Sequence, residues 1–304
     1  MNLGYACINT GLSANKIMTN RTMRRKTFDA QGIDYVSDLA LANVKDLKTI
    51  VQWNNEMGIK LFRLSSQIFP WSDEYDITHL KDIVEINGLM LEIGQIATDA
   101  GQRLTMHPGP YNCLASPTQN VVDKTIRQLN FHSYQFNMMG YTPSNYNKIN
   151  IHVGGAYGDK ETTLARFCDN FHLLNDDTKK RLVIENDDSP NEYSVKDLYH
   201  GIHKRIGIPI TFDYFHHKFN TGGQTEEEAL HLAATTWPED VPQCCHYSES
   251  RRKEKLDESI RPQAHSDIIY DEIKTYGLEP DIVIEAKLKE QAIFNYGKTK
   301  TICG

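Results

Sequence analysis

Carboxylates and imidazoles interrupt an apolar run in the stretch TFDYFHH, residues 211–217. A strand that ends here is expected to be followed by turn residues, yet Asp213, His216 and His217 follow instead. These side chains either cap the strand end through hydrogen bonds or bind a metal ion, because neutral imidazoles and carboxylates are ligands of Zn²⁺, Mn²⁺ and Fe²⁺. Side chains of the same kind close five other apolar runs: His107, His152, Glu185, His246 and Glu285.

The spacing of these residues indicates which elements carry them. Positions 107, 152, 185, 213, 246 and 285 are 45, 33, 28, 33 and 39 residues apart, which is about one strand, one helix and their loops. Between the apolar runs lie amphipathic stretches whose apolar residues recur every three or four positions. The eight runs cover residues 3–8, 59–65, 103–107, 148–153, 181–186, 208–213, 243–247 and 281–286. This alternation predicts an α/β fold, a (β/α)₈ TIM barrel that forms a single domain over residues 1–304.

A barrel of this kind would bring the polar strand ends together. The carboxyl ends of all eight strands meet at one rim, so side chains far apart in sequence converge there. For any single residue, hydrogen-bond capping is the simpler interpretation, but an acid or an imidazole at six successive strand ends favours a metal site. His265, between the last two strands, adds a fifth imidazole. Five imidazoles and three carboxylates exceed the needs of one tetrahedral ion, so we expect two or three divalent ions. Mn²⁺ is favoured, and Zn²⁺ and Fe²⁺ accept the same ligands.

Composition limits the class of protein. The chain has 304 residues, a formal net charge of −7, 39% hydrophobic residues and six scattered cysteines. The negative charge argues against nonspecific coating of nucleic acid, and the cysteines form no disulfide framework. We expect a cytoplasmic protein without a membrane segment or an obligate protein partner. Two basic clusters, at 15–28 and 250–261, are candidate phosphate contacts or solvated surface loops; the first contains no acid.

Six ordered motifs resemble the ultraviolet damage endonucleases: HPGPY (107–111), NIHVGGAYGDK (150–160), LVIENDD (182–188), FDYFHHKFN (212–220), CHYSES (245–250) and DIVIEAKLKE (281–290). The N-terminal LGYACIN and FRLSSQIFPW (62–71) are similar to that family as well. The family is similar in fold and metal chemistry to endonuclease IV. The resemblance implies an enzyme that nicks double-stranded DNA immediately 5′ of photoproducts, with abasic sites as further targets, and leaves 3′-hydroxyl and 5′-phosphate ends.

The resemblance also implies roles for individual residues. The family's metal ligands correspond to His107, His152, Glu185, Asp213, His216, His246, His265 and Glu285. Among these, Glu185, His246 and His107 are the expected catalytic residues. Tyr5 and Asn9 match residues near the lesion, and Pro110-Tyr111 stands where the family has a polar–aromatic pair that probes the duplex. Pro110 departs from the family pattern, and so does Cys244, where some relatives carry a lysine that can be modified.

Basic residues supply the remaining predictions about DNA. Lys160 and Lys218 follow metal-ligand motifs and are candidate phosphate contacts, and Lys160 is also a catalytic candidate. Arg24 and Arg25, in the 15–28 cluster, are expected to bind phosphates.

Two other functions remain open from the sequence. A metal-dependent sugar isomerase would also present His, Asp and Glu at barrel strand ends, although with fewer histidines and no use for a basic loop. A non-catalytic binder of damaged DNA would carry only structural metals, whose sites are usually closed and four-coordinate.

Overall fold

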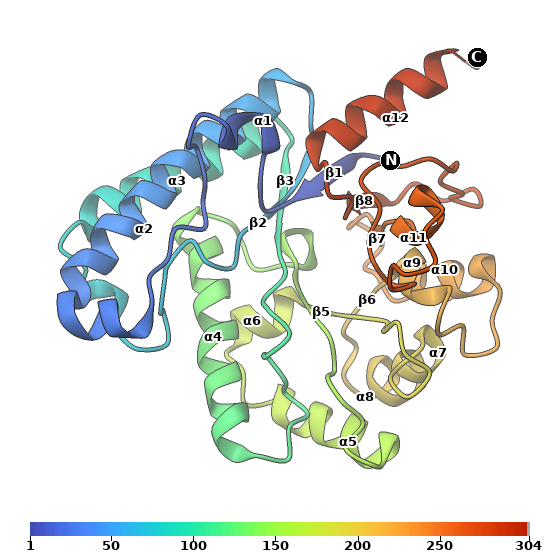
Figure 1. Cartoon of the computed structure of the whole chain (residues 1–304). Coiled ribbons are helices and arrows are strands. Elements are labelled where there is room, and N and C mark those ends of the chain that lie inside the picture. The colour runs from blue at the N-terminus through green and yellow to red at the C-terminus, as the bar shows by residue number, and fades with distance from the viewer. Residues whose placement is uncertain (303–304) are drawn as a thin grey trace.

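The computed structural model, which describes residues 1–302 and the side chains of residues 1–297, is one barrel domain (Figure 1). Its eight parallel strands are hydrogen-bonded in the order β6-β5-β4-β3-β2-β1-β8-β7. They are β1 (Leu3–Ala6), β2 (Leu61–Leu64), β3 (Arg103–Met106), β4 (Ile149–Ile151), β5 (Leu182–Glu185), β6 (Ile210–Thr211), β7 (Cys244–Tyr247) and β8 (Asp281–Ile284). All eight strands predicted from the sequence are present, so the predicted barrel is confirmed; residues 303–304 of the predicted domain lie outside the described residues.

Helices follow the strands around the outside. They are α1 (Thr10–Ser13), α2 (Arg25–Glu56), α3 (Ile83–Asp99), α4 (Gln119–Met138), α5 (Lys160–Phe171), α6 (Asp176–Arg181), α7 (Val195–Leu198), α8 (Lys204–Ile206), α9 (Tyr214–His217), α10 (Glu226–Ala234), α11 (Arg251–Lys255) and α12 (Glu290–Ile302). Three short 3-10 or π-helical turns add η1 (Ile77–His79), η2 (Asn145–Asn147) and η3 (Tyr199–His203). None of the helices within the described residues is long and apolar enough to cross a membrane.

The two ends of the sheet meet at two of the candidate site residues. Strands β6 and β7 share only a parallel bridge between Asp213 and His246. The amide nitrogen of His246 donates to the carbonyl of Phe212 at 2.9 Å. The barrel therefore closes at its polar rim.

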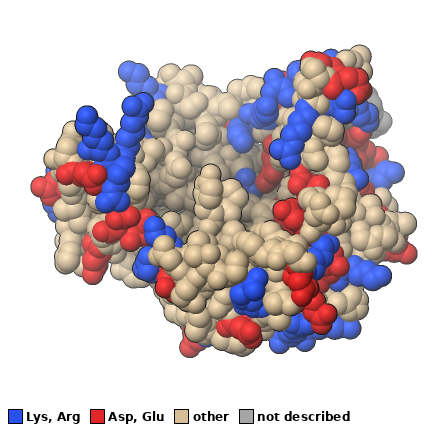
Figure 2. All heavy atoms as spheres, turned by 60° about the horizontal axis from the view of Figure 1, so that its bottom comes forward, with Lys and Arg blue, Asp and Glu red and all other residues tan. Residues whose placement is uncertain are grey.

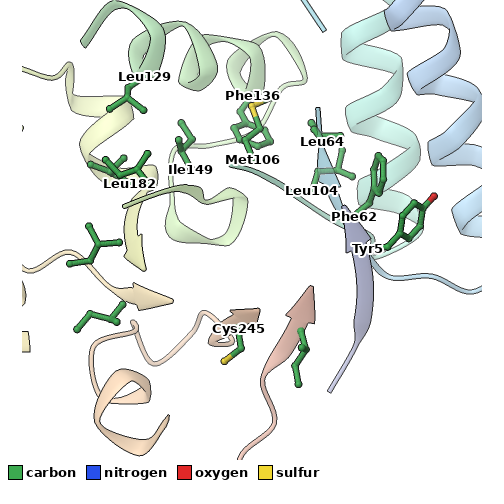
Figure 3. Close-up of a cluster of buried hydrophobic side chains, with 14 of the residues drawn as sticks. Tyr5, Phe62, Leu64, Leu104, Met106, Leu129, Phe136, Ile149, Leu182 and Cys245 are labelled. Atoms are coloured by element: carbon green, nitrogen blue, oxygen red, sulfur yellow. The ribbon is translucent and has the colours of Figure 1, made fainter. Parts of the chain in front are cut away.

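Side chains alternate along each strand, as the pleat requires. One set points outward and packs under the helices, where Figure 3 shows Phe62, Leu104, Ile149 and Leu182 among the buried side chains. This apolar layer is expected to supply most of the stability, at ~25 cal/mol for each Å² of apolar surface buried. The other set points inward and fills the barrel.

The amino end of the barrel is filled by packed side chains. Arg103, at the start of β3, is buried and donates to Asp281 at 3.0 Å and to the carbonyl of Pro242 at 2.8 Å. Its guanidinium also lies over the ring of Trp237. Above it, Val183, Cys244 and other small apolar side chains pack together. Polar inward-facing residues then occupy the carboxyl rim, where barrel strands can present functional groups.

The basic segment at 15–28, expected as a loop, is partly helical. Helix α2 begins at Arg25 and contains a kink at Gly32, whose φ of 66° is a left-handed conformation that glycine adopts at little cost. The last residues of the basic segment are therefore fixed in the first turn of a long helix.

Candidate metal centre

Glu185, at the end of β5, lies at the centre of the polar rim. Its carboxylate is 1% exposed and has four imidazoles around it. Oε2 lies 3.1 Å from Nε2 of His107, 3.1 Å from Nδ1 of His246 and 3.7 Å from Nε2 of His152. Oε1 lies 3.5 Å from Nδ1 of His216. Side chains from four other strand ends thus converge on this carboxylate.

Two groups of side chains have the geometry to hold a metal ion, and they share this carboxylate. One is His107, Glu185 and His246, and the other is His152, Glu185 and His216. In each group one nitrogen or oxygen atom per residue lies within 4.8 Å of the others. A carboxylate that belongs to two neighbouring ligand groups can bridge the ions of a two-metal site, in which the ions lie ~3.5–4 Å apart.

Three of the four histidines are anchored through Nδ1. For His107 the partner is the carbonyl of Pro108 at 3.1 Å, and for His216 it is the carbonyl of Asn186 at 2.8 Å. His152 places Nδ1 2.7 Å from Oδ1 of Asp187. An oxygen acceptor on one ring nitrogen fixes the tautomer and leaves the other nitrogen, here Nε2, to bind a metal. The nitrogen nearest Glu185 is Nε2 in His107 and His152, whereas it is Nδ1 in His216 and His246.

Glu285, Arg63 and His265 form the β8 side of the site. The Arg63 guanidinium donates to Oε1 of Glu285, and Nδ1 of His265 lies 3.7 Å from Oε2 of the same carboxylate. Burial alone would raise the pKa of Glu285, but Arg63 and His246 hold it well below its usual range. Glu285 is therefore an anion in the folded protein.

Unsatisfied buried atoms show that the site suits cations. Oδ1 of Asp213 accepts the amides of Phe215 and His216, but its fully buried Oδ2 has no hydrogen-bond partner among the described residues. Burial raises the pKa of Asp213 to about 7. Nδ1 of His246 and Nδ1 of His265 also lack a partner that meets hydrogen-bond geometry. Buried acceptors of this kind are rare unless an ion or water binds them, so the residues present fit divalent ions.

Two residues that we placed beside the lesion are instead in the core. Tyr5 is 0% exposed, points outward from the barrel and donates its hydroxyl to Asn54 of α2 at 2.7 Å. Asn9 donates to the Tyr5 hydroxyl at 3.0 Å and caps α1 through Leu12. A side chain without exposed surface has no face on which a base can stack. Tyr5 and Asn9 are therefore corrected to residues that hold the β1–α1 segment.

Two predicted phosphate contacts are also occupied by protein partners. The Lys160 ammonium donates to the carbonyls of Glu192 and Pro190 and lies 3.5 Å from Asp197. Arg25 forms ion pairs with Asp29 at 2.9 Å and Glu74 at 3.1 Å. Both cations therefore already have protein partners, and their contact with phosphate, like the catalytic role of Lys160, stays a prediction.

Other predicted DNA contacts are open to solvent. Tyr111 is 90% exposed, Pro110 next to it is exposed, and Lys218 is exposed with its ammonium over the ring of Phe215. Arg24 is exposed and forms no ion pair within the described part of the chain. By contrast, the cations of the 250–261 cluster largely face local acids, as in the Arg252–Glu258 and Lys253–Asp271 pairs.

The face that carries these residues is hollowed. Helices α2 and α4 begin on the side that lies at the bottom of Figure 1, and Figure 2 turns that side forward. Its centre is a hollow with mostly uncharged walls, and lysine and arginine side chains stand at the margins. A cleft of about 350 Å³ lies beside Tyr111, with Gln67, Trp71 and His132 among the residues that line it.

Sequence reasoning missed four polar residues of the site. Arg63 holds Glu285, Asp187 holds His152, Asn150 donates to Oε2 of Glu185, and Lys148 lies beside His246. Strand alternation was the available signal for three of them. Arg63 is the inward residue at the end of β2, and Asn150 and Lys148 stand two and four positions before His152 on the same face.

Comparison with known proteins identifies the family of this chain. The sequence profile of the family described as UV-endonuclease UvdE matches residues 1–301. The chain belongs to this family. A UV-damage endonuclease of Schizosaccharomyces pombe is 36% identical over 96% of this chain, which spans only 49% of that relative. The crystal structure of SacUVDE matches with a TM-score of 0.85 and 30% identity, covering 100% of this chain and 99% of the other.

The barrel itself is shared with sugar-converting enzymes. The 3-keto-D-glucoside 4-epimerase of E. coli matches with a TM-score of 0.57 at 10% identity, over 99% of this chain and 98% of the epimerase. Similarity at this level concerns the fold alone. Family membership and the site therefore carry the functional argument.

Proposed function

We propose that this chain is a metal-dependent endonuclease that incises double-stranded DNA immediately 5′ of UV photoproducts, both cyclobutane pyrimidine dimers and 6-4 photoproducts, and at abasic sites. The observation that carries the proposal is Glu185, whose buried carboxylate belongs to both groups of metal-binding side chains at the open end of the barrel. The names of the relatives supply the class of substrate.

The metal-binding residues fall into three sets. His107 and His246 would hold one ion with Glu185, and His152 and His216 a second. Asp213, Glu285 and His265 complete these shells or hold a third ion. Bound divalent ions, of which Mn²⁺ is favoured, would supply a water that loses a proton near neutral pH. They would also supply a Lewis acid that stabilises the negative charge on the leaving oxygen. The protein residues orient the ligands, and in-line displacement at phosphorus leaves 3′-hydroxyl and 5′-phosphate ends.

Recognition of the lesion falls to side chains outside the metal centre. Tyr111 presents an exposed ring on the loop that follows His107, with Pro110 to stiffen the loop. Stacking of a base on such a ring contributes ~1–3 kcal/mol. A photodimer is already poorly stacked, so it is extruded at lower cost than a sound base pair. Arg24 and Lys218 supply phosphate contacts that do not depend on sequence.

Incision of a defined substrate tests the proposal. An end-labelled duplex with one cyclobutane dimer is incubated with the metal-stripped protein, with and without added Mn²⁺, and with EDTA as a control. We expect a single nick at the phosphate 5′ of the dimer that requires the metal. Binding of the damaged duplex without any nick would support a non-catalytic binder, and conversion of an aldose to a ketose without nicking would support a sugar isomerase.

A further inference from the structure

Tyr157 is a second exposed aromatic residue at the rim that carries the metal centre. It lies on the loop between His152 and α5, and 49% of its surface is exposed. Within the described part of the chain, the most exposed tyrosine, phenylalanine and tryptophan side chains are Tyr111, Tyr134 and Tyr157. Tyr134 lies in the last part of α4, away from the rim where that helix begins. Two exposed rings therefore belong to the rim, and the mechanism above uses only Tyr111.

The two loops that carry these rim tyrosines lie side by side. They leave the metal centre next to each other, since the rings of His107 and His152 have their centroids 5.4 Å apart. Farther out, a Cβ placed on Gly154 would lie only 2.9 Å from Sγ of Cys113, two residues after Tyr111. The backbone of one loop therefore packs directly against the other, which places the two rings on one continuous surface.

The backbone and the ring of Tyr157 are both held in place. Its φ of 48° is a left-handed conformation that bulky side chains rarely adopt. The guanidinium of Arg166, on α5, lies 5.7 Å from the centre of the ring, and it is itself anchored on the carbonyl of Ala115 at 2.7 Å. Strained residues persist where the surrounding structure fixes them, and they cluster at sites that bind ligands. Tyr157 thus presents a preorganised ring with about half of its surface open.

We propose that Tyr157 is a second stacking residue for the unpaired bases of a damaged duplex, and that Tyr111 and Tyr157 form a two-ring platform that matches the two linked bases of a pyrimidine dimer. Every base has a π-face, so a tyrosine ring can stack on it whatever the sequence. An abasic site has lost its base and offers fewer unpaired bases to such a platform. The proposal rests on the proposed function and adds to it a feature that favours dimers over abasic sites.

Single-turnover incision by the whole protein at increasing concentrations tests this role. The half-saturating protein concentration reports binding, and the maximal rate reports the chemical step. The substrates are two duplexes of one sequence, the first with a single cyclobutane dimer and the second with a single abasic site. We expect Tyr157→Ala to raise the half-saturating concentration for the dimer duplex by about 5- to 150-fold, and for the abasic duplex by a smaller factor. The maximal rate should change less.

Two matched variants serve as controls. Tyr157→Phe keeps the ring and should behave nearly as the parent does on both duplexes. Tyr134→Ala removes a tyrosine of similar exposure, 41%, that lies away from the rim, and it should not change either substrate's half-saturating concentration.

A double-mutant cycle separates stacking from packing. If Tyr157 only holds the loop of Tyr111, then Tyr157→Ala should add nothing to Tyr111→Ala, whereas two rings that stack on different bases give losses that add as free energies. If Tyr157→Ala does not fold, Tyr157→Gly replaces it, because glycine removes the ring and adopts a φ of 48° at little cost.

Equal losses on the two duplexes, or no further loss in the Tyr111→Ala background, would overturn the proposal. A parent protein that nicks neither duplex would refute the proposed function instead, which is a distinguishable result.

Discussion

At the scale of single residues, Glu185 is the side chain on which the candidate site depends most, since its carboxylate is shared by both groups of metal-binding side chains. Replacing it with glutamine removes the negative charge that both ions would share. We expect Glu185→Gln to reduce bound Mn²⁺ and to lower incision by at least ~100-fold. A loss of ~100-fold is the upper end of the effect of removing a residue that only orients a metal ligand. Mass spectrometry of metal content and single-turnover incision measure this. Glu239→Gln, on an exposed loop before β7, is the matched control.

Tyr111 is the residue whose exposure suggests contact with the lesion. Tyr111→Ala should weaken binding of a dimer-containing duplex by ~1–3 kcal/mol, or roughly 5- to 150-fold in Kd, because the stacking surface is lost. Incision at saturating protein should change less, since the metal-binding residues are intact. Tyr111→Phe keeps the ring and should bind nearly as the parent does. Equal affinity of the alanine variant and the parent for damaged duplex would remove Tyr111 from recognition.

At the scale of elements, the start of α2 distinguishes two neighbouring arginines. Arg24 is exposed without an ion pair among the described residues, whereas Arg25 is held by Asp29 and Glu74. Arg24→Ala should flatten the logarithmic dependence of DNA affinity on salt by ~0.9, the value for one neutralised phosphate. Arg25→Ala should leave that slope unchanged and is the matched control. Filter binding across a salt series measures both slopes, and equal flattening by the two variants would contradict the assignment.

At the scale of the whole molecule, two residues of the candidate metal centre also close the barrel, since β6 and β7 are bridged at Asp213 and His246. Burial lowers the pKa of His152 and His216, but nearby carboxylates, chiefly Glu185 and Asp213 respectively, outweigh it and raise these values to about 10 and about 9. Both values lie above 6.5, the ordinary value for histidine. The metal-free folded state therefore keeps protons that the unfolded chain loses, and its stability falls as pH rises from 6.5 to 9.

This linkage predicts opposite trends for metal-free and metal-loaded protein. The Tm of EDTA-treated protein should fall between pH 6.5 and pH 9, because protonated His152 and His216 offset the buried carboxylates only in the folded state. Mn²⁺ affinity should rise over the same range, because the ions compete with those protons. Circular dichroism melts and Mn²⁺ titrations at several pH values measure the two trends. A Tm that rises with pH in metal-free protein would contradict the charge arrangement.

The sequence by itself determined the barrel and the set of polar residues at its rim. Strand and helix periods are local properties, and parallel strands connected by helices have their carboxyl ends on one side, so His107, His152, Glu185, His246 and Glu285 could be placed together without coordinates. Their role as metal ligands stays a prediction.

Only the tertiary structure decided which face and which partner each side chain has. Tyr5 stands at a strand end like the site residues, but strand alternation points it outward to Asn54 of α2. The sequence shows no partner for Lys160 or Arg25, whereas in the fold Lys160 donates to a carbonyl and Arg25 pairs with an acid. From the sequence, Lys148 is a lysine at the edge of a strand, whereas in the fold its ammonium is buried against Thr211 of β6 and His246 of β7. These contacts join residues far apart in the chain, and no local pattern encodes them.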